Sequence, residues 1–131
     1  MKKIVYSVFV DISEDKLDNP GWFENDVQVK TDKSLQTKAA LLNNYDKIII
    51  SQKSYADSIG ADYYLYELDK EYQDFTEMFE KDYPEVSYYD IVNFYKHWTM
   101  RKLADEYDVI CYLDFDVIPN TNDSIFDAHD I

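Results

Sequence analysis

The stretch that decides the fold is Ile4-Val5-Tyr6-Ser7-Val8-Phe9-Val10, which is followed at once by Asp11. β-Branched and aromatic residues of this kind favour a β-strand. A strand with one face in water alternates apolar and polar residues, whereas this run is almost continuously apolar. Such a pattern is typical of a strand that is buried on both faces, as in a parallel sheet covered by helices. The sequence therefore predicts an α/β fold.

Helical periodicity follows and predicts one long amphipathic helix over 34–59, which Gly60 ends as a C-terminal cap. The apolar residues recur at intervals of three, four and seven: Leu41, Tyr45, Ile48, Tyr55 and Ile59. Within this stretch Ile48-Ile49-Ile50 alone also fits a strand, but the stripe continues through it in phase, so we favour the helix. Between the first strand and this helix, residues 13–33 are polar and predict an irregular excursion with a turn at 19–21.

The second half of the chain continues the alternation of strands and helices. Residues 62–67 predict a short strand, and Asp74 followed by Glu77 predicts a capping box that opens a short helix before Pro84. A helix over 89–107 and a strand over 109–113 come next. This order predicts a three-layer α/β sheet in a single domain over 1–131.

Composition excludes several classes of protein. The 131 residues carry 27 acidic and 13 basic side chains, so the formal net charge is −14 and nucleic acid is not an expected partner. No apolar run is long enough to span a membrane, and no signal peptide is expected after Met1. The one cysteine, Cys111, rules out an internal disulfide and suits a reducing compartment. We expect a soluble, cytoplasmic protein.

The strongest candidate for chemistry is Tyr112-Leu113-Asp114-Phe115-Asp116-Val117, at the end of the last predicted strand. Side chains alternate along a strand, so Asp114 and Asp116 are expected on the same face. Open α/β sheets bind ligands outside the carboxyl ends of their strands. Two carboxylates there repel each other unless a cation lies between them, and Mn²⁺ or Mg²⁺ suits such oxygen ligands. The alternative is an acidic strand end that is simply solvated.

Lys96 stands out on the preceding helix because it falls within an apolar stripe. The other members of the stripe are Val92, Thr99, Met100, Leu103 and Tyr107. An unpaired ammonium is costly in such surroundings. Lys96 either extends to the surface along its alkyl chain or reaches an anion at the edge of the sheet, which is Asp114, Asp116 or a bound pyrophosphate.

The stretch from Asn93 to Phe126 resembles glycosyltransferases of the GT-A fold. Those enzymes show a Lys or Arg on a helix, then a Tyr-Asp pair, a hydrophobic run ending in Leu-Asp-x-Asp-Val, and a segment that contains Phe. The resemblance implies a Rossmann-like sheet that binds a nucleotide-diphospho-sugar. It implies metal ligation by Asp116 together with Asp114, which also contacts the ribose or a metal-bound water. It also implies that Lys96 contacts the diphosphate and that Phe115 belongs to the donor site. The residues implied to face the nucleobase are Phe9, Val10 and Asp11.

The activity that the resemblance implies is metal-dependent transfer of a sugar from a UDP- or GDP-sugar to an acceptor that the sequence does not identify. Members of that group continue beyond the acidic motif with an acceptor site and, in inverting enzymes, a catalytic base. We therefore expect this chain to correspond to the N-terminal, donor-binding part. The alternatives are an acidic interaction or decoy protein without enzymatic activity, and a donor-binding half completed by a partner chain or a homo-oligomer.

Overall fold

The computed structural model describes residues 1–11 and 32–128. The predicted irregular excursion over 13–33 lies outside these residues, except for 32 and 33, with which the first helix begins. In chain order the elements are β1 (Lys3–Val8), α1 (Asp32–Asn43), α2 (Tyr45–Ser58), β2 (Asp62–Tyr66), α3 (Lys70–Asp82), α4 (Tyr88–Leu103), β3 (Val109–Tyr112) and α5 (Ile125–Ala128). The fold is mixed α/β, as the sequence predicts.

The three strands form a parallel sheet in the order β2-β1-β3. Ile4 pairs with Asp62 on one side of β1, and Lys3 pairs with Val109 on the other side. The central strand is therefore the one that the continuous apolar run identifies. Its side chains from Ile4 to Val8 are all buried, which confirms a strand covered on both faces.

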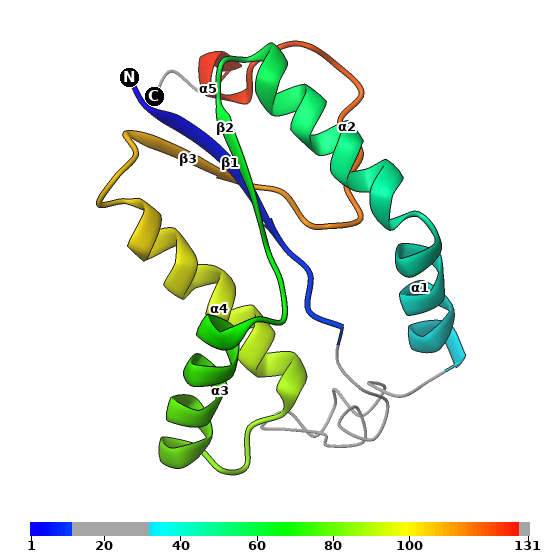
Figure 1. Ribbon diagram of the computed structural model, residues 1–131, viewed down its shortest axis with the longest axis vertical. Coiled ribbons are helices and arrows are strands. Elements are labelled where there is room, and N and C mark those ends of the chain that lie inside the picture. The colour runs from blue at the N-terminus through cyan, green and yellow to red at the C-terminus, as the bar shows by residue number, and fades with distance from the viewer. Residues whose placement is uncertain (12–31, 129–131) are drawn as a thin grey trace.

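Helices cover the two faces of the sheet (Figure 1), and each face has its own core. On one face β1 packs against α3 and α4, and the buried residues there are Ile4, Tyr6, Val8, Tyr66, Tyr72, Phe75, Val86, Ile91, Tyr95 and Leu103. On the other face it packs against α2 and α5, and the buried residues there are Val5, Tyr55, Ala56, Ile59, Ala61, Val109 and Phe126. The predicted three-layer arrangement is confirmed by this division of the core.

The predicted long helix over 34–59 is wrong in one respect, because the chain forms two helices there. Asn44 separates α1 from α2 with φ −110° and ψ 13°, outside the helical range. Its side-chain Nδ2 donates to the carbonyl of Ala40 at 2.8 Å, so the amide takes a carbonyl of the preceding turn. Asparagine offers the backbone such alternatives to a helix. The predicted cap is confirmed, since Gly60 has φ 72°.

Other boundaries also differ from the prediction: β1 ends at Val8 rather than at Val10, and β2 ends at Tyr66 rather than at Glu67. The predicted capping box at Asp74 is wrong: the N-cap of α3 is Asp69, whose side chain accepts from the backbone N–H of Tyr72 at 2.9 Å. Asp74 lies inside α3 and pairs with Lys70 at 3.0 Å. The helix predicted over 89–107 ends at Leu103, and the strand predicted over 109–113 ends at Tyr112.

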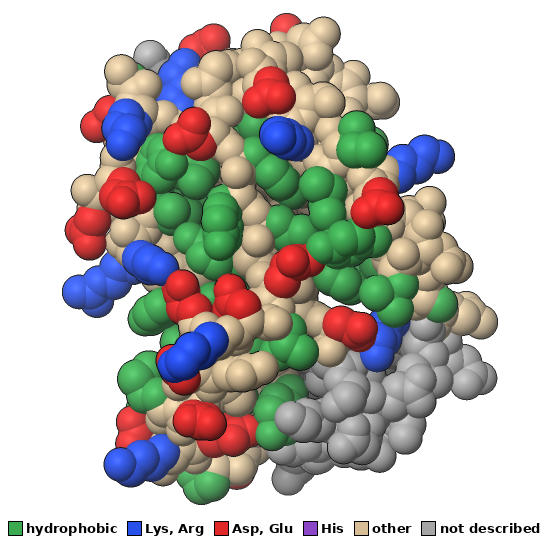
Figure 2. Space-filling model, viewed as in Figure 1, with side chains coloured by type: hydrophobic (Ala, Val, Ile, Leu, Met, Phe, Trp, Pro, Cys, Tyr) green, Lys and Arg blue, Asp and Glu red, His purple; other side chains and the backbone are tan. Residues whose placement is uncertain are grey.

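No helix among residues 1–11 and 32–128 is both long and apolar enough to cross a membrane. Figure 2 shows that the acidic side chains on one face are spread among hydrophobic and basic ones rather than gathered in a single array.

Candidate functional site

The candidate site lies at the carboxyl edge of the sheet, where the strand order reverses. The connection from β1 to β2 includes α2 on one face of the sheet, and the connection from β2 to β3 consists of α3 and α4 on the opposite face. β2 and β3 lie on opposite sides of β1. The carboxyl ends of β1 and β3 are therefore neighbours with connections on opposite faces. Ligands of open α/β sheets bind at such a switch point.

The acidic motif forms a turn at this point, so the expected alternation of its two carboxylates along a strand is wrong. The backbone of the motif hydrogen-bonds to the sheet through the N–H of Leu113, which donates to the carbonyl of Tyr6 at 2.9 Å. The N–H of Val117 then donates to the carbonyl of Asp114 at 2.9 Å and closes the turn. Asp114 and Asp116 are both exposed, whereas Phe115 between them is buried. The turn therefore presents two carboxylates to solvent at the edge of the sheet.

Gln52 of α2 holds this turn in place by hydrogen bonds from the buried side. Its side chain is fully buried, and its Nε2 donates to the carbonyls of Asp114 at 3.1 Å and Val117 at 2.9 Å. Its Oε1 accepts from the hydroxyl of Tyr63 on β2 at 2.6 Å. One side chain thus connects α2, β2 and both ends of the turn. Sequence reasoning missed Gln52, because a single amide on the same helical face as Ile48 and Tyr55 carries no motif.

Lys96 of α4 reaches the same turn. Its Nζ lies 3.7 Å from Asp114 Oδ1 and 3.3 Å from Asn93 Oδ1, and it lies 5.4 Å from the centre of the Tyr112 ring. This agrees with the second of the two alternatives for Lys96, that it reaches an anion at the edge of the sheet. The two side chains are 25% and 62% exposed, so the ion pair is partly screened by water and contributes little to stability.

Aromatic rings connect the end of β1 to the acidic turn. Phe9 stacks on Phe115 with ring centres 4.6 Å apart, and Tyr45 contacts both rings at 6.0 Å and 5.7 Å. Phe115, an expected donor contact, is only 5% exposed, so its ring supports Phe9 from below. Val10, expected to face the nucleobase, packs against the core between the sheet and α3 and α4. Of the expected base contacts, Phe9 and Asp11 line a pocket.

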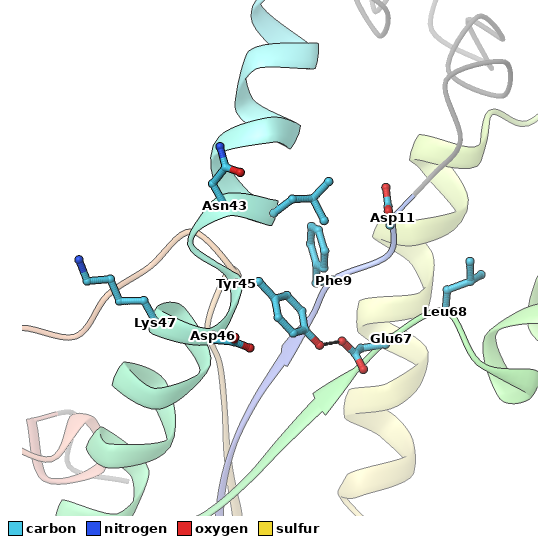
Figure 3. A pocket seen from close by; sticks show the side chains of 9 residues that line it. Phe9, Asp11, Asn43, Tyr45, Asp46, Lys47, Glu67 and Leu68 are labelled. Atoms are coloured by element: carbon cyan, nitrogen blue, oxygen red, sulfur yellow. Dashed lines mark hydrogen bonds between the residues drawn. The ribbon is translucent and has the colours of Figure 1, made fainter.

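That pocket, with a volume of about 670 Å³, lies at the ends of β1 and β2 beside the break between α1 and α2 (Figure 3). Its lining consists of Phe9, Asp11, Leu42, Asn43, Tyr45, Asp46, Lys47, Glu67 and Leu68. The hydroxyl of Tyr45 donates to Glu67 Oε1, and Lys38 pairs with Asp11 at 2.9 Å. Sequence reasoning missed Tyr45 and Glu67. The sequence does contain a signal for Glu67, namely an acidic residue directly after a strand. Asp11 stands in the same way after the first apolar run.

Ionisation is perturbed beside the acidic turn. Burial, followed by the hydrogen bond and the charge of Asp114, raises the pKa of the Tyr112 phenol, so this ring stays neutral. Burial also raises the pKa of the Cys111 thiol, which removes it as a nucleophile at neutral pH.

The donor set suits an ion that is shared with a ligand. Among residues 1–11 and 32–128 no three His, Cys, Asp or Glu side chains are grouped so that they could hold a metal by themselves. Asp114 and Asp116 supply two carboxylates. Mg²⁺ is bound in many proteins by one or two carboxylates, with phosphate oxygens and waters completing its shell. The residues present fit that mode of binding.

Comparison with known proteins found no match among family models, curated proteins or solved structures.

Proposed function

We propose that this chain binds a nucleotide-diphospho-sugar together with Mn²⁺ or Mg²⁺, as the donor-binding part of a metal-dependent glycosyltransferase of the GT-A fold. The observation that carries the proposal is the position of the exposed carboxylates of Asp114 and Asp116. They lie in a turn at the switch point of a parallel sheet. Phe115 of this turn packs against Phe9 and Tyr45, which line a pocket of about 670 Å³.

Each part of the site has a role in this proposal. Asp114 and Asp116 would hold the ion, which, when bound, stabilises the negative charge that develops on a departing nucleoside diphosphate. Lys96, already within 4 Å of Asp114, would contact a diphosphate oxygen. Gln52 keeps the turn in place, and the pocket beside Phe9 would take the nucleoside. The acceptor and the catalytic base are not part of the described site.

The net charge explains why binding should require the metal. A chain of charge −14 repels a diphosphate, and the exposed acidic turn adds to this repulsion locally. A divalent cation between the carboxylates and the phosphates reverses the local sign. Nucleotide diphosphates should therefore bind in Mn²⁺ and fail to bind in EDTA.

The test is isothermal titration calorimetry, supported by thermal melting, with GDP and UDP in Mn²⁺ or EDTA. A ligand at a hundred times its Kd stabilises the folded state by about 2.7 kcal/mol, which a melting curve resolves. We expect Asp116→Asn to abolish metal-dependent binding without loss of fold. The matched control is Asp105→Asn, an exposed aspartate just after α4, at the opposite edge of the sheet, which should bind as the wild type does. No metal-dependent binding of any nucleoside diphosphate to the wild type would refute the proposal.

The high negative charge favours one other function, that of an acidic protein which binds a basic partner. Such binding should weaken steeply with salt and be unaffected by Asp116→Asn. Figure 2 shows hydrophobic side chains between the carboxylates, which is a poorer mimic of a phosphate backbone than a continuous acidic array.

A further inference from the structure

The polar groups in the pocket beside Phe9 are mostly hydrogen-bond acceptors. Three carboxylates line it, from Asp11, Asp46 and Glu67, against one ammonium, from Lys47, and one amide, from Asn43, which both donates and accepts. Figure 3 shows the Lys47 side chain directed away from Tyr45 and Glu67. Asp11 is held by Lys38 of α1 at 2.9 Å. The three carboxylates outnumber the two donor side chains, so the pocket favours a ligand that presents donors.

Glu67 is the carboxylate whose position is fixed by the fold. It follows the last residue of β2 and is half-buried. Its Oε1 accepts a hydrogen bond from the hydroxyl of Tyr45, the first residue of α2 (Figure 3). A carboxylate has about four lone-pair positions, and the Tyr45 hydroxyl occupies one. With respect to residues 1–11 and 32–128, Oε2 and the second lone pair of Oε1 are left to accept from a ligand.

The walls of the pocket suit a flat ring. Phe9 and Tyr45 are only half-buried, and their ring centres lie 6.0 Å apart. Leu42 and Leu68, 44% and 51% exposed, add apolar surface on the other sides. Partly exposed aromatic rings bind nucleobases by stacking, which is indifferent to the identity of the base. Selection among bases therefore falls to the polar groups.

We infer that the pocket selects guanine, with Glu67 accepting from the base; this inference rests on the proposed function and names GDP-sugars as the donor class. Guanine presents two neighbouring donors on its Watson–Crick edge, N1–H and the 2-amino group, which a carboxylate accepts as a pair. Uracil presents a single N3–H between two carbonyl oxygens, and carboxylates beside those oxygens repel them. Adenine presents its 6-amino group next to N1, which is itself an acceptor.

The inference is tested by calorimetry on the full chain in Mn²⁺ with GDP, UDP and IDP, which lacks the 2-amino group. A good bidentate contact to a base discriminates by about ten- to a hundredfold. We expect GDP to bind at least about tenfold more tightly than UDP, with IDP in between.

The variant Glu67→Gln should remove or reverse the preference for GDP over UDP. Its amide oxygen still accepts from Tyr45, but an NH₂ group, which only donates, takes the place of Oε2. Binding of GDP should weaken about ten- to a hundredfold. Binding of UDP should stay the same or tighten, because an amide donor now faces a uracil carbonyl and one negative charge is removed. The control Glu77→Gln, on the exposed surface of α3, should leave the ratio of the two Kd values unchanged.

The wild-type comparison of GDP with UDP decides the inference even if Glu67→Gln folds poorly. UDP that binds as tightly as GDP, or a Kd ratio that Glu67→Gln leaves unchanged in a folded protein, would overturn guanine selection while the proposed function stands. Absence of metal-dependent binding by all three diphosphates would overturn both.

Discussion

Replacement of Gln52 by leucine should destabilise the protein by about 2–4 kcal/mol, because each buried polar group that loses its partner costs about 1–3 kcal/mol. The change removes the Nε2 donor to Asp114 and Val117 and the acceptor of the Tyr63 hydroxyl. The carbonyl of Asp114 keeps one partner, the N–H of Val117, so the cost falls below the sum of three lost bonds. Leucine has a similar volume, so no large cavity adds to this figure.

The assay is urea unfolding followed by circular dichroism, with Gln73→Leu as the matched control. Gln73 lies on the exposed surface of α3, where substitutions change the free energy of unfolding by about 0.5 kcal/mol or less. A double-mutant cycle with Tyr63→Phe should give a coupling of at least about 0.5 kcal/mol, since the two side chains share one hydrogen bond. A loss from Gln52→Leu no larger than that of the control would refute the view that this side chain holds the turn.

Two further predictions concern Lys96 and the tyrosines. Lys96→Met should change the free energy of unfolding by less than about 1 kcal/mol, because its ion pair is partly exposed. Binding of nucleoside diphosphates should weaken while that of nucleosides does not, and a loss of several kcal/mol in unfolding would instead make Lys96 structural. Burial raises the pKa of Tyr63 and Tyr72 from 10.0 to about 12, so the folded state keeps protons that the unfolded state releases. Stability should then be constant with respect to these groups below pH 10 and fall between pH 10 and 12. Phenolate absorbance and circular dichroism measured together check this, and ionisation of all 13 tyrosines near pH 10 with the helices intact would contradict it.

The elements that could be predicted from the sequence are those in which periodicity and burial agree. The run from Ile4 to Val10 identified the central strand because both of its faces are buried. The break at Asn44 was missed because the apolar stripe resumes in the same phase at Tyr45, so periodicity is insensitive to a single non-helical residue. This break matters for the site, since the residues on either side of it line the pocket.

The candidate site was partly predictable for a similar reason. The acidic motif was placed correctly at the end of β3, because a charged run after a buried strand indicates where the strand leaves the core. Its conformation as a turn was not predictable, because the turn depends on Gln52, which lies far away in the sequence. Contacts between distant elements, such as Tyr45 with Glu67, leave no local pattern.

The central place of β1 in the sheet has a consequence for how the chain folds. Ile4 pairs with Asp62, and Lys3 pairs with Val109, so neither neighbour of β1 is close to it in sequence. During synthesis β1 emerges first and exposes two unpaired edges until β2 and then β3 are made. Sheets built from such distant pairings fold slowly, and unpaired apolar strands associate with one another in the meantime. Refolding yield should therefore fall as protein concentration rises, and association through β1 should account for the loss.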